Sequence, residues 1–285
     1  VFLLCFEGNN FLFELKIKSR IFLKNGEKIK GWIMKIAISG KGGVGKTTIA
    51  AALIRSFART HRLVYAIDGD PDASLAAALG IPEEEAARLQ PVVEMKELIR
   101  SRSGSGAFYV LNPKVDDIIE DYSYRLGNIR FLRMGEIKKG GSECYCRENT
   151  FLHALVSALL LDQDEAVVMD MGAGIEHLTR GTAKGVDLML VVVEPGRASV
   201  NTARNVLRLS SDLGIKKVRI IGNKIRSAKE RDFLVASFDP GAIIGMIGYD
   251  EAIWESAMER PAADVGEGLR KEVENIKERI LNGGR

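Results

Sequence analysis

The 285-residue sequence is poor in cysteine, histidine and aromatic residues. It holds three cysteines and three histidines, and aromatic residues make up 7% of the chain. Three cysteines provide no disulfide framework, which is typical of a protein that works in a reducing cytoplasm. No apolar run reaches the roughly 20 residues that a membrane-spanning helix needs. The sequence therefore argues against a disulfide-stabilised fold and against a membrane-embedded one.

The net charge is also small, at +3. Residues 1–33 contain six Lys or Arg and three Glu, so they account for all of it, and the charges from Met34 onward balance. A neutral domain gives no electrostatic reason to expect a nucleic-acid partner. The helix expected at Ala263–Leu281 has mixed charge and lacks the basic face of a helix that lies on a membrane.

The most informative stretch is the run Gly40-Lys41-Gly42-Gly43-Val44-Gly45-Lys46-Thr47-Thr48. It fits the P-loop spacing G-x-x-x-x-G-K-[ST], between an expected strand at Met34–Ser39 and a helix from Thr48 onward. The glycines let backbone N–H groups face a phosphate, and the helix N-terminus adds partial positive charge. We expect Lys46 to reach the β- and γ-phosphates and Thr47 to ligate Mg²⁺. A glycine-rich turn without a ligand is the alternative, but it leaves the whole pattern unexplained.

Two expected buried strands end in an aspartate. The strand Arg62–Asp68 leads into Asp68-Gly69-Asp70-Pro71-Asp72, and the strand Glu165–Asp170 ends at Asp170. Carboxylates at the C-terminal ends of parallel strands lie over the crevice where nucleotides bind. Apolar residues followed by Asp170 form a Walker B pattern, in which the carboxylate holds Mg²⁺, usually through water. We expect Asp68 to support the site and Asp72 to be an exposed turn residue. Asp-Pro is a common turn pair, so one interpretation of Asp70 is an acidic turn without a catalytic role.

The other expected elements alternate between strand and helix. They predict an α/β fold, with a three-layer, doubly wound, mostly parallel sheet and helices on both faces. Residues 81–142 are less regular, and we interpret them as an insertion on the nucleotide face. The elements concerned are strands at Ile129–Arg133, Asp187–Glu194, Lys217–Gly222 and Ala242–Ile247 and helices at Val93–Arg100, Thr150–Leu161 and Ser199–Leu213.

The pair Asn223-Lys224 follows the strand Lys217–Gly222. In P-loop proteins an asparagine here reads the purine edge. A guanine site of the N-K-x-D kind needs a carboxylate two residues after the lysine, where this sequence has Arg226. A side-chain amide can donate to adenine N7 and accept from the adenine amino group, so we favour ATP over GTP.

Cys144 and Cys146 lie in a glycine-rich loop near residues 140–147. A redox pair is more often C-x-x-C. One C-x-C supplies two thiolates, whereas Zn²⁺ prefers four ligands and Ni²⁺ can take four in a plane. A second copy of the chain would complete the set. We favour binding of Ni²⁺ or Zn²⁺, with a structural or redox role as the alternative.

The phosphate loop resembles the deviant P-loop, K-G-G-x-G-K-[ST], of the MinD/nitrogenase-iron-protein class of ATPases. In that class a lysine at the position of Lys41 reaches the nucleotide of a partner subunit, much as an arginine finger does. The aspartate before the proline, here Asp70, orients the attacking water. A solvated loop lysine is the alternative for Lys41.

Longer stretches are similar to the CooC family, accessory ATPases for nickel insertion into anaerobic carbon monoxide dehydrogenase. They are GKGGVGKTT, DGDP, LNPKVDD, KKGGSECYC, MDMGAGIEHLTRGTA and VVVEPGRASVNTA, and the likeness covers Met34 to about Leu281. Gly172 is a departure, because we expect an acidic residue there. The resemblance implies a cytoplasmic homodimer with ATP in its interface and a metal ion held by Cys144 and Cys146 of both subunits. Its client would be a nickel-iron carbon monoxide dehydrogenase.

Three rival functions share parts of this pattern. A MinD- or ParA-like positioning or partition ATPase should carry a membrane helix or a basic DNA surface, and it needs no C-x-C. An electron donor like the nitrogenase iron protein uses cysteines that lie far apart in sequence. A non-enzymatic scaffold would not need Lys46, Thr47, Asp70 and Asp170 together.

The first 33 residues differ in character from the rest. They do not begin with Met and lack the order of regions of a signal peptide, whereas Met34 opens the first expected strand. We expect residues 1–33 to be an N-terminal extension from a misassigned start, with a genuine added hairpin or arm as the alternative. Residues 34–285 then form one ATPase domain.

Overall fold

The computed structural model describes most of the chain from Met34 onward and a short hairpin before it. The described residues are 21–24, 27–30, 34–70, 72–103, 115–135, 151, 154–156, 164–173, 185–256 and 266–283. The strands are β1 (Ile21–Lys24), β2 (Glu27–Lys30), β3 (Met34–Gly40), β4 (Leu63–Gly69), β5 (Tyr124–Leu126), β6 (Ile129–Arg133), β7 (Glu165–Ala173), β8 (Leu188–Val193), β9 (Val218–Ile225) and β10 (Ile243–Gly248). The helices are α1 (Lys46–Ala58), α2 (Leu75–Ala78), α3 (Glu83–Arg88), the 3₁₀ turn η1 (Val92–Glu94), α4 (Lys96–Ser103), α5 (Asp116–Tyr122), α8 (Arg197–Asp212), α9 (Ala228–Ser237), α10 (Glu251–Ser256) and α11 (Glu267–Leu281).

A sheet of eight strands forms the centre of the molecule, in the order β10-β9-β8-β3-β7-β4-β6-β5. Every neighbouring pair is parallel except β5 with β6, which is antiparallel. Strands β1 and β2 pair with each other in a separate antiparallel sheet. The predicted doubly wound α/β fold is therefore confirmed, with an antiparallel strand at one edge.

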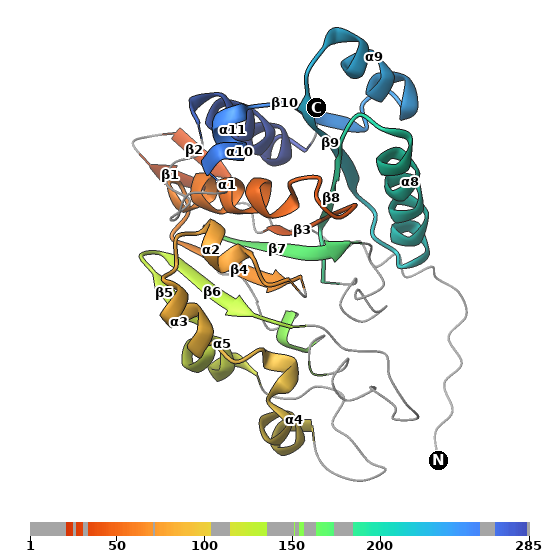
Figure 1. The fold of residues 1–285 in the computed structure, drawn as a ribbon. Coiled ribbons are helices and arrows are strands. Elements are labelled where there is room, and N and C mark those ends of the chain that lie inside the picture. The colour runs from red at the N-terminus through yellow and green to blue at the C-terminus, as the bar shows by residue number, and fades with distance from the viewer. Residues whose placement is uncertain are drawn as a thin grey trace, which may run out of the picture.

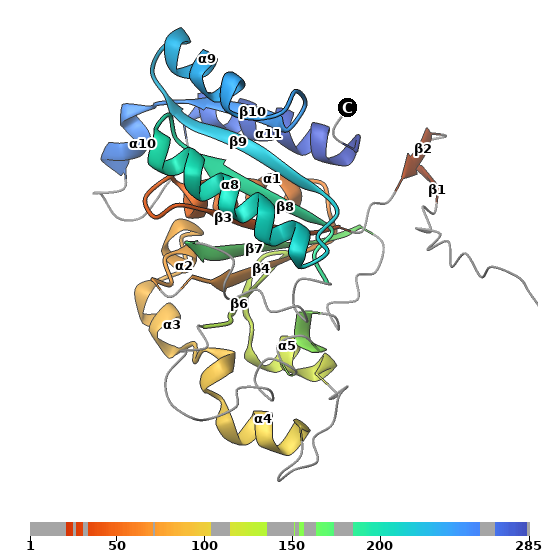
Figure 2. The same cartoon turned by 90° about the vertical axis from the view of Figure 1, so that its right-hand side faces the viewer.

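Helices cover both faces of the sheet, so the molecule has three layers (Figures 1 and 2). On one face α1 and α11 pack over Ile36 and Ile38 of β3, and on the other α8 packs on the side that Ala37 faces. All six residues of β8 are buried. Such a continuous apolar run is expected of a parallel strand that helices cover on both sides.

The spacing of apolar residues in α11 explains which side of this helix packs on the sheet. In α11 the residues Leu269, Val273, Ile276 and Ile280 recur three or four positions apart and are all buried, which is the pattern of a helix with one apolar stripe. Of the helices that the structure describes, none has the length and apolar character needed to cross a bilayer.

Residues 81–142 are more regular than an irregular insertion would be, where the structure describes them. Strand β6 pairs with β4 and so extends the central sheet, and Met134 N–H continues the pairing by donating to Asp68 O at 2.8 Å. Phe131 faces the core beside α1, whereas Leu132 and Ile118 join the core on the α8 face. The interpretation of this segment as an insertion is therefore corrected. Strand β6 is part of the central sheet, and its residues pack into the hydrophobic clusters on both faces of that sheet.

Candidate nucleotide-binding site

The phosphate loop runs from the end of β3 to the start of α1 and depends on two glycines. Gly45 has a φ of +94°, and a Cβ there would lie 2.5 Å from Asn223 Nδ2. At Gly40 a Cβ would lie 2.4 Å from the carbonyl oxygen of Val192. Only glycine fits either position without a shift of the neighbouring atoms. The loop therefore brings backbone N–H groups and the N-terminus of α1 together, which is the arrangement that binds phosphate.

Two buried carboxylates lie beside this loop on adjacent strands. Asp68 of β4 and Asp170 of β7 are directly paired residues, 1% and 0% exposed. Asp68 accepts hydrogen bonds from the backbone N–H groups of Asp70 and Leu75, each at 3.2 Å. Burial raises the pKa of Asp68 to about 7, with a further rise from Asp170, while the two hydrogen bonds oppose the shift. Asp68 therefore helps to fix the turn that carries Asp70.

The Asp170 carboxylate is buried without a strong hydrogen-bond partner in the part of the chain that the structure describes. Among the described residues neither of its oxygens makes a hydrogen bond of normal geometry, although the Thr47 hydroxyl lies close enough to lower its pKa. Burial raises the pKa of Asp170 to about 6, although the Thr47 hydroxyl lowers it. The negative charge of Asp70 raises this pKa further, and the positive charge of Lys46 lowers it. A buried carboxylate without a partner is costly, and a cation would remove that cost.

The oxygens at this position fit Mg²⁺. Thr47 and Asp170 would supply hard oxygen ligands, and Thr47 Oγ1 lies 3.3 Å from Ser74 Oγ. Within the described ranges no three His, Cys, Asp or Glu residues gather into a metal site. Mg²⁺ typically takes one or two protein oxygens and fills its other positions with phosphate and water, so the residues present suit it.

Lys46 and Asp70 face each other across the loop. Lys46 Nζ lies 3.9 Å from Asp70 Oδ2 and donates to the carbonyl oxygen of Lys41 at 3.4 Å. Asp70 Oδ1 accepts from the backbone N–H of Asp72 at 3.1 Å, which fixes the turn, and Asp72 itself is exposed. The structure thus brings Lys46, Asp70, Thr47 and Asp170 to one place, at the C-terminal ends of β3, β4 and β7.

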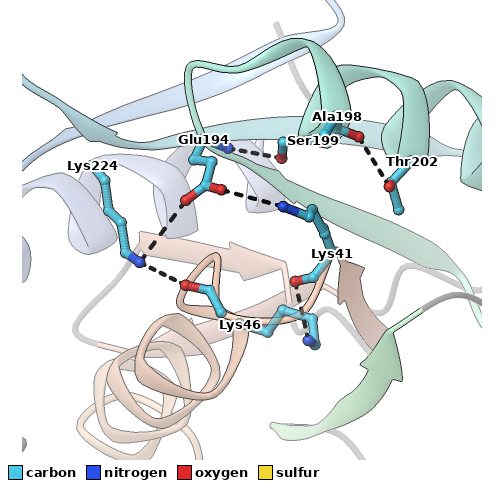
Figure 3. A network of polar contacts seen from close by, with 8 residues as sticks. Lys41, Lys46, Glu194, Ala198, Ser199, Thr202 and Lys224 are labelled. Atoms are coloured by element: carbon cyan, nitrogen blue, oxygen red, sulfur yellow. Dashed lines mark hydrogen bonds and ion pairs between the residues drawn. The ribbon is translucent and has the colours of Figure 1, made fainter.

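Lys41 points away from Lys46, toward the end of β8. Its Nζ lies 4.0 Å from Glu194 Oε1, while Lys224 Nζ lies 3.9 Å from Glu194 Oε2 (Figure 3). Lys224 also donates to the carbonyl oxygen of Gly43 at 2.6 Å. Glu194 and Lys224 each stand where an expected strand ends, but the sequence predicted no role for either.

Asn223 supports the loop from β9. It is 8% exposed, and its Nδ2 donates to the carbonyl oxygen of Val44 at 2.8 Å. The same side chain lines a cavity of about 480 Å³ beside the loop, together with Thr48, Arg226 and Tyr249. The Arg226 guanidinium stacks on the Tyr249 ring, 4.2 Å from its centroid. The cavity adjoins the phosphate loop, because Gly43 and Gly45 also line it.

Some predicted positions lie outside the described residues. These include Cys144 and Cys146, the whole loop at 140–147, and the residues from 174 to 184. Of the helix expected at Thr150–Leu161, Phe151 and residues 154–156 are described and helical. Gly172, the departure noted above, is buried inside β7, where an acidic side chain would need a partner.

Comparison with known proteins agrees with this geometry. Residues 35–261 match the family model of the CobQ/CobB/MinD/ParA nucleotide binding domain. The chain is 42% identical over 224 residues to the carbon monoxide dehydrogenase accessory protein CooC of Rhodospirillum rubrum, covering 77% of this chain and 85% of that one. It is 40% identical over 256 residues to an ATP-binding protein of Methanocaldococcus jannaschii, covering 87% of this chain and 98% of that one.

Among solved structures, the MinD cell division protein of Aquifex aeolicus superposes with a TM-score of 0.61 at 18% identity, covering 87% of this chain and 97% of that one. At that identity the likeness establishes the fold alone. The family match goes further, because the matched residues 35–261 include the phosphate loop. The chain therefore belongs to the CobQ/CobB/MinD/ParA family, as a P-loop ATPase of the CooC type.

Proposed function

We propose that this ATPase closes as a homodimer over ATP in the cytoplasm and delivers nickel to an anaerobic carbon monoxide dehydrogenase. The observation that carries the proposal is its similarity to CooC, named as an accessory protein of carbon monoxide dehydrogenase, in a chain that also holds the Cys144-x-Cys146 pair. We assign the ATPase to one domain, residues 34–285, because the family match spans 35–261; residues 1–33 would be an extension to it.

Each residue of the nucleotide site has a part in the proposed reaction. Lys46 and the loop N–H groups bind the β- and γ-phosphates, and Asp70 orients the attacking water. Thr47 and Asp170 hold Mg²⁺, which neutralises charge on the phosphates when it is bound. Lys41 of the second copy then adds a positive charge to the transferring phosphoryl group, so hydrolysis depends on dimerisation.

The metal is cargo in this scheme. Cys144 and Cys146 from two copies supply four thiolates, enough for tetrahedral Zn²⁺ or square-planar Ni²⁺. Closure over ATP sets the distance between the two cysteine loops, and hydrolysis changes it. This links the state of the nucleotide to the release of the metal.

A positioning or partition ATPase remains the second candidate, because solved structures of MinD have the same fold. That likeness does not account for the C-x-C pair. The neutral net charge from Met34 onward also gives no electrostatic reason to expect DNA binding.

Transfer to the client tests the proposal. Reduced protein loaded with nickel is mixed with nickel-free carbon monoxide dehydrogenase, with and without Mg²⁺ and ATP, and enzyme activity is followed. We expect activity to appear with ATP and to be absent with the Asp170→Asn variant. Equal activation with and without ATP, or no activation, would contradict the proposed delivery role.

A further inference from the structure

Two charged residues beside the phosphate loop, Glu194 and Lys224, have no part in the scheme above. The Glu194 carboxylate lies between Lys41 Nζ, at 4.0 Å, and Lys224 Nζ, at 3.9 Å (Figure 3). Lys224 Nζ in turn donates to the carbonyl oxygen of Gly43 at 2.6 Å. These contacts form a ring that leaves the loop at Lys41 and returns to it two residues later.

The backbone of Glu194 is held in place. Its N–H donates to the hydroxyl of Ser199 at 3.1 Å, and Ser199 is 2% exposed near the start of α8. Pro195 follows directly and restricts Glu194 to extended conformations. Glu194 therefore presents its carboxylate from a fixed backbone.

Lys224 is anchored in a similar way. Its φ of +59° is one that residues other than glycine seldom adopt, and such conformations persist where surrounding contacts hold them. Asn223, the preceding residue, donates to the carbonyl oxygen of Val44, next to the Gly43 carbonyl that Lys224 contacts. The end of β9 thus holds two successive carbonyl groups of the loop.

We propose that Glu194 is a positioning residue that keeps Lys41 on its own subunit until a second copy carrying a triphosphate draws it away. This inference rests on the proposed function, in which Lys41 acts across the dimer. The Lys41 ammonium is a single point charge, so it gives up its contact with Glu194 when it moves to the partner's phosphates. A diphosphate attracts the lysine less strongly than a triphosphate does, so the contact with Glu194 favours the separated state after hydrolysis.

The strength of the contact suits a reversible device. Lys41 and Glu194 are 44% and 32% exposed, and ion pairs of that exposure stabilise a structure only weakly. A triphosphate with Mg²⁺ can therefore overcome it. Because each dimer gives up two such pairs, removing the Glu194 charge should tighten triphosphate-driven association by about five-fold.

The test is sedimentation equilibrium with Mg²⁺ and a non-hydrolysable ATP analogue. We compare wild type, Glu194→Gln, Lys41→Gln and the double variant, with Asp232→Asn, an exposed carboxylate of α9, as a control for loss of surface charge. Glu194→Gln should lower the dimer dissociation constant about five-fold, and the change should disappear when Lys41 is also Gln. Glu194→Asp keeps the charge but withdraws the carboxylate by one methylene, so it should behave like Glu194→Gln.

Several results would overturn the inference. If Glu194→Gln changed the dimer dissociation constant equally in the wild-type and Lys41→Gln proteins, Glu194 would act through its charge alone and not through its contact with Lys41. Association of Glu194→Asp at the wild-type level would mean that charge rather than contact matters. If wild type dimerises and Glu194→Gln leaves the constant unchanged, the inference alone fails. If neither protein associates, the role of Lys41 across the dimer fails and the inference falls with it.

Discussion

Asp68 and Asp170 are directly paired on β4 and β7, both almost fully buried, and burial raises the pKa of each, to about 7 and about 6. Two acids this close repel each other when both are ionised. The nucleotide-free protein therefore retains protons near neutral pH at the position where we expect Mg²⁺. We expect a bound cation to relieve this repulsion.

The first prediction concerns stability and pH in the absence of metal. The unfolded chain releases the Asp68 proton near its ordinary pKa of 3.8, whereas the folded protein keeps it to about pH 7. The folded state thus binds more protons between these values, so its stability falls as the pH rises through them and levels off above. Asp68→Asn should remove a loss on the order of 3 kcal/mol between pH 4.5 and 8. Urea unfolding in EDTA from pH 4.5 to 8 measures this, and parallel curves for both proteins would refute it.

The second prediction concerns Asp170. Asp170→Asn removes the buried negative charge that we expect to face Mg²⁺, so ATP turnover should fall at least about 100-fold. Nucleotide affinity measured without Mg²⁺ should change little. Asp72→Asn removes the same charge from an exposed turn residue and serves as the matched control, with turnover close to wild type. If added Mg²⁺ still strengthens ATP binding to Asp170→Asn as it does for wild type, Asp170 is not its ligand.

The third prediction separates turnover from binding at Lys41. Lys41→Gln should lower ATP turnover at least about 100-fold, because a cation supplied across an interface contributes that much or more in phosphoryl transfer. ADP affinity should change less than about three-fold, since Lys41 faces Glu194 and not the loop interior. Lys229→Gln on α9 is the control for loss of a surface lysine. Turnover that is unchanged in Lys41→Gln would rule out a contribution across the dimer.

The fourth prediction concerns the two uses of the Asn223 amide. Asn223→Ala leaves the Val44 carbonyl without its donor, which should weaken binding of inorganic triphosphate and of ATP by about ten-fold. If the amide also reads adenine, ATP binding should weaken further than triphosphate binding does. Titration calorimetry with both ligands measures the difference. If Asn223→Ala weakened the binding of both ligands equally, Asn223 would support the phosphate loop without contacting adenine.

Much of the site could be predicted from short stretches of sequence. The phosphate loop and Asp70 follow buried strands, and Asp170 lies in the second half of one; the apolar run of each strand is visible in the sequence. In a parallel sheet the ends of such strands meet at one edge, so their side chains were expected together. The structure places Lys46 against Asp70 accordingly.

Other features depend on which strands become neighbours, and no local pattern specifies that. Glu194 meets Lys41 and Lys224 because β8 lies between β3 and β9 in the sheet. Strand β6 was expected, but its place beside β4 follows from residues that pack on both faces. Arg226 was noted for what it excludes, a guanine-binding carboxylate, while its stacking on Tyr249 arises from the ends of β9 and β10 meeting.

The proposed function requires that two copies close over ATP and share one metal ion between their cysteine pairs. Native mass spectrometry of the reduced protein with Ni²⁺ or Zn²⁺ and a non-hydrolysable ATP analogue tests it most directly. We predict a dimer with two nucleotides and one transition-metal ion, and a dimer without that ion when Cys144 and Cys146 are both Ser. A single chain with no transition metal in the nucleotide-loaded wild type, or metal retained by the serine variant, would contradict the claim.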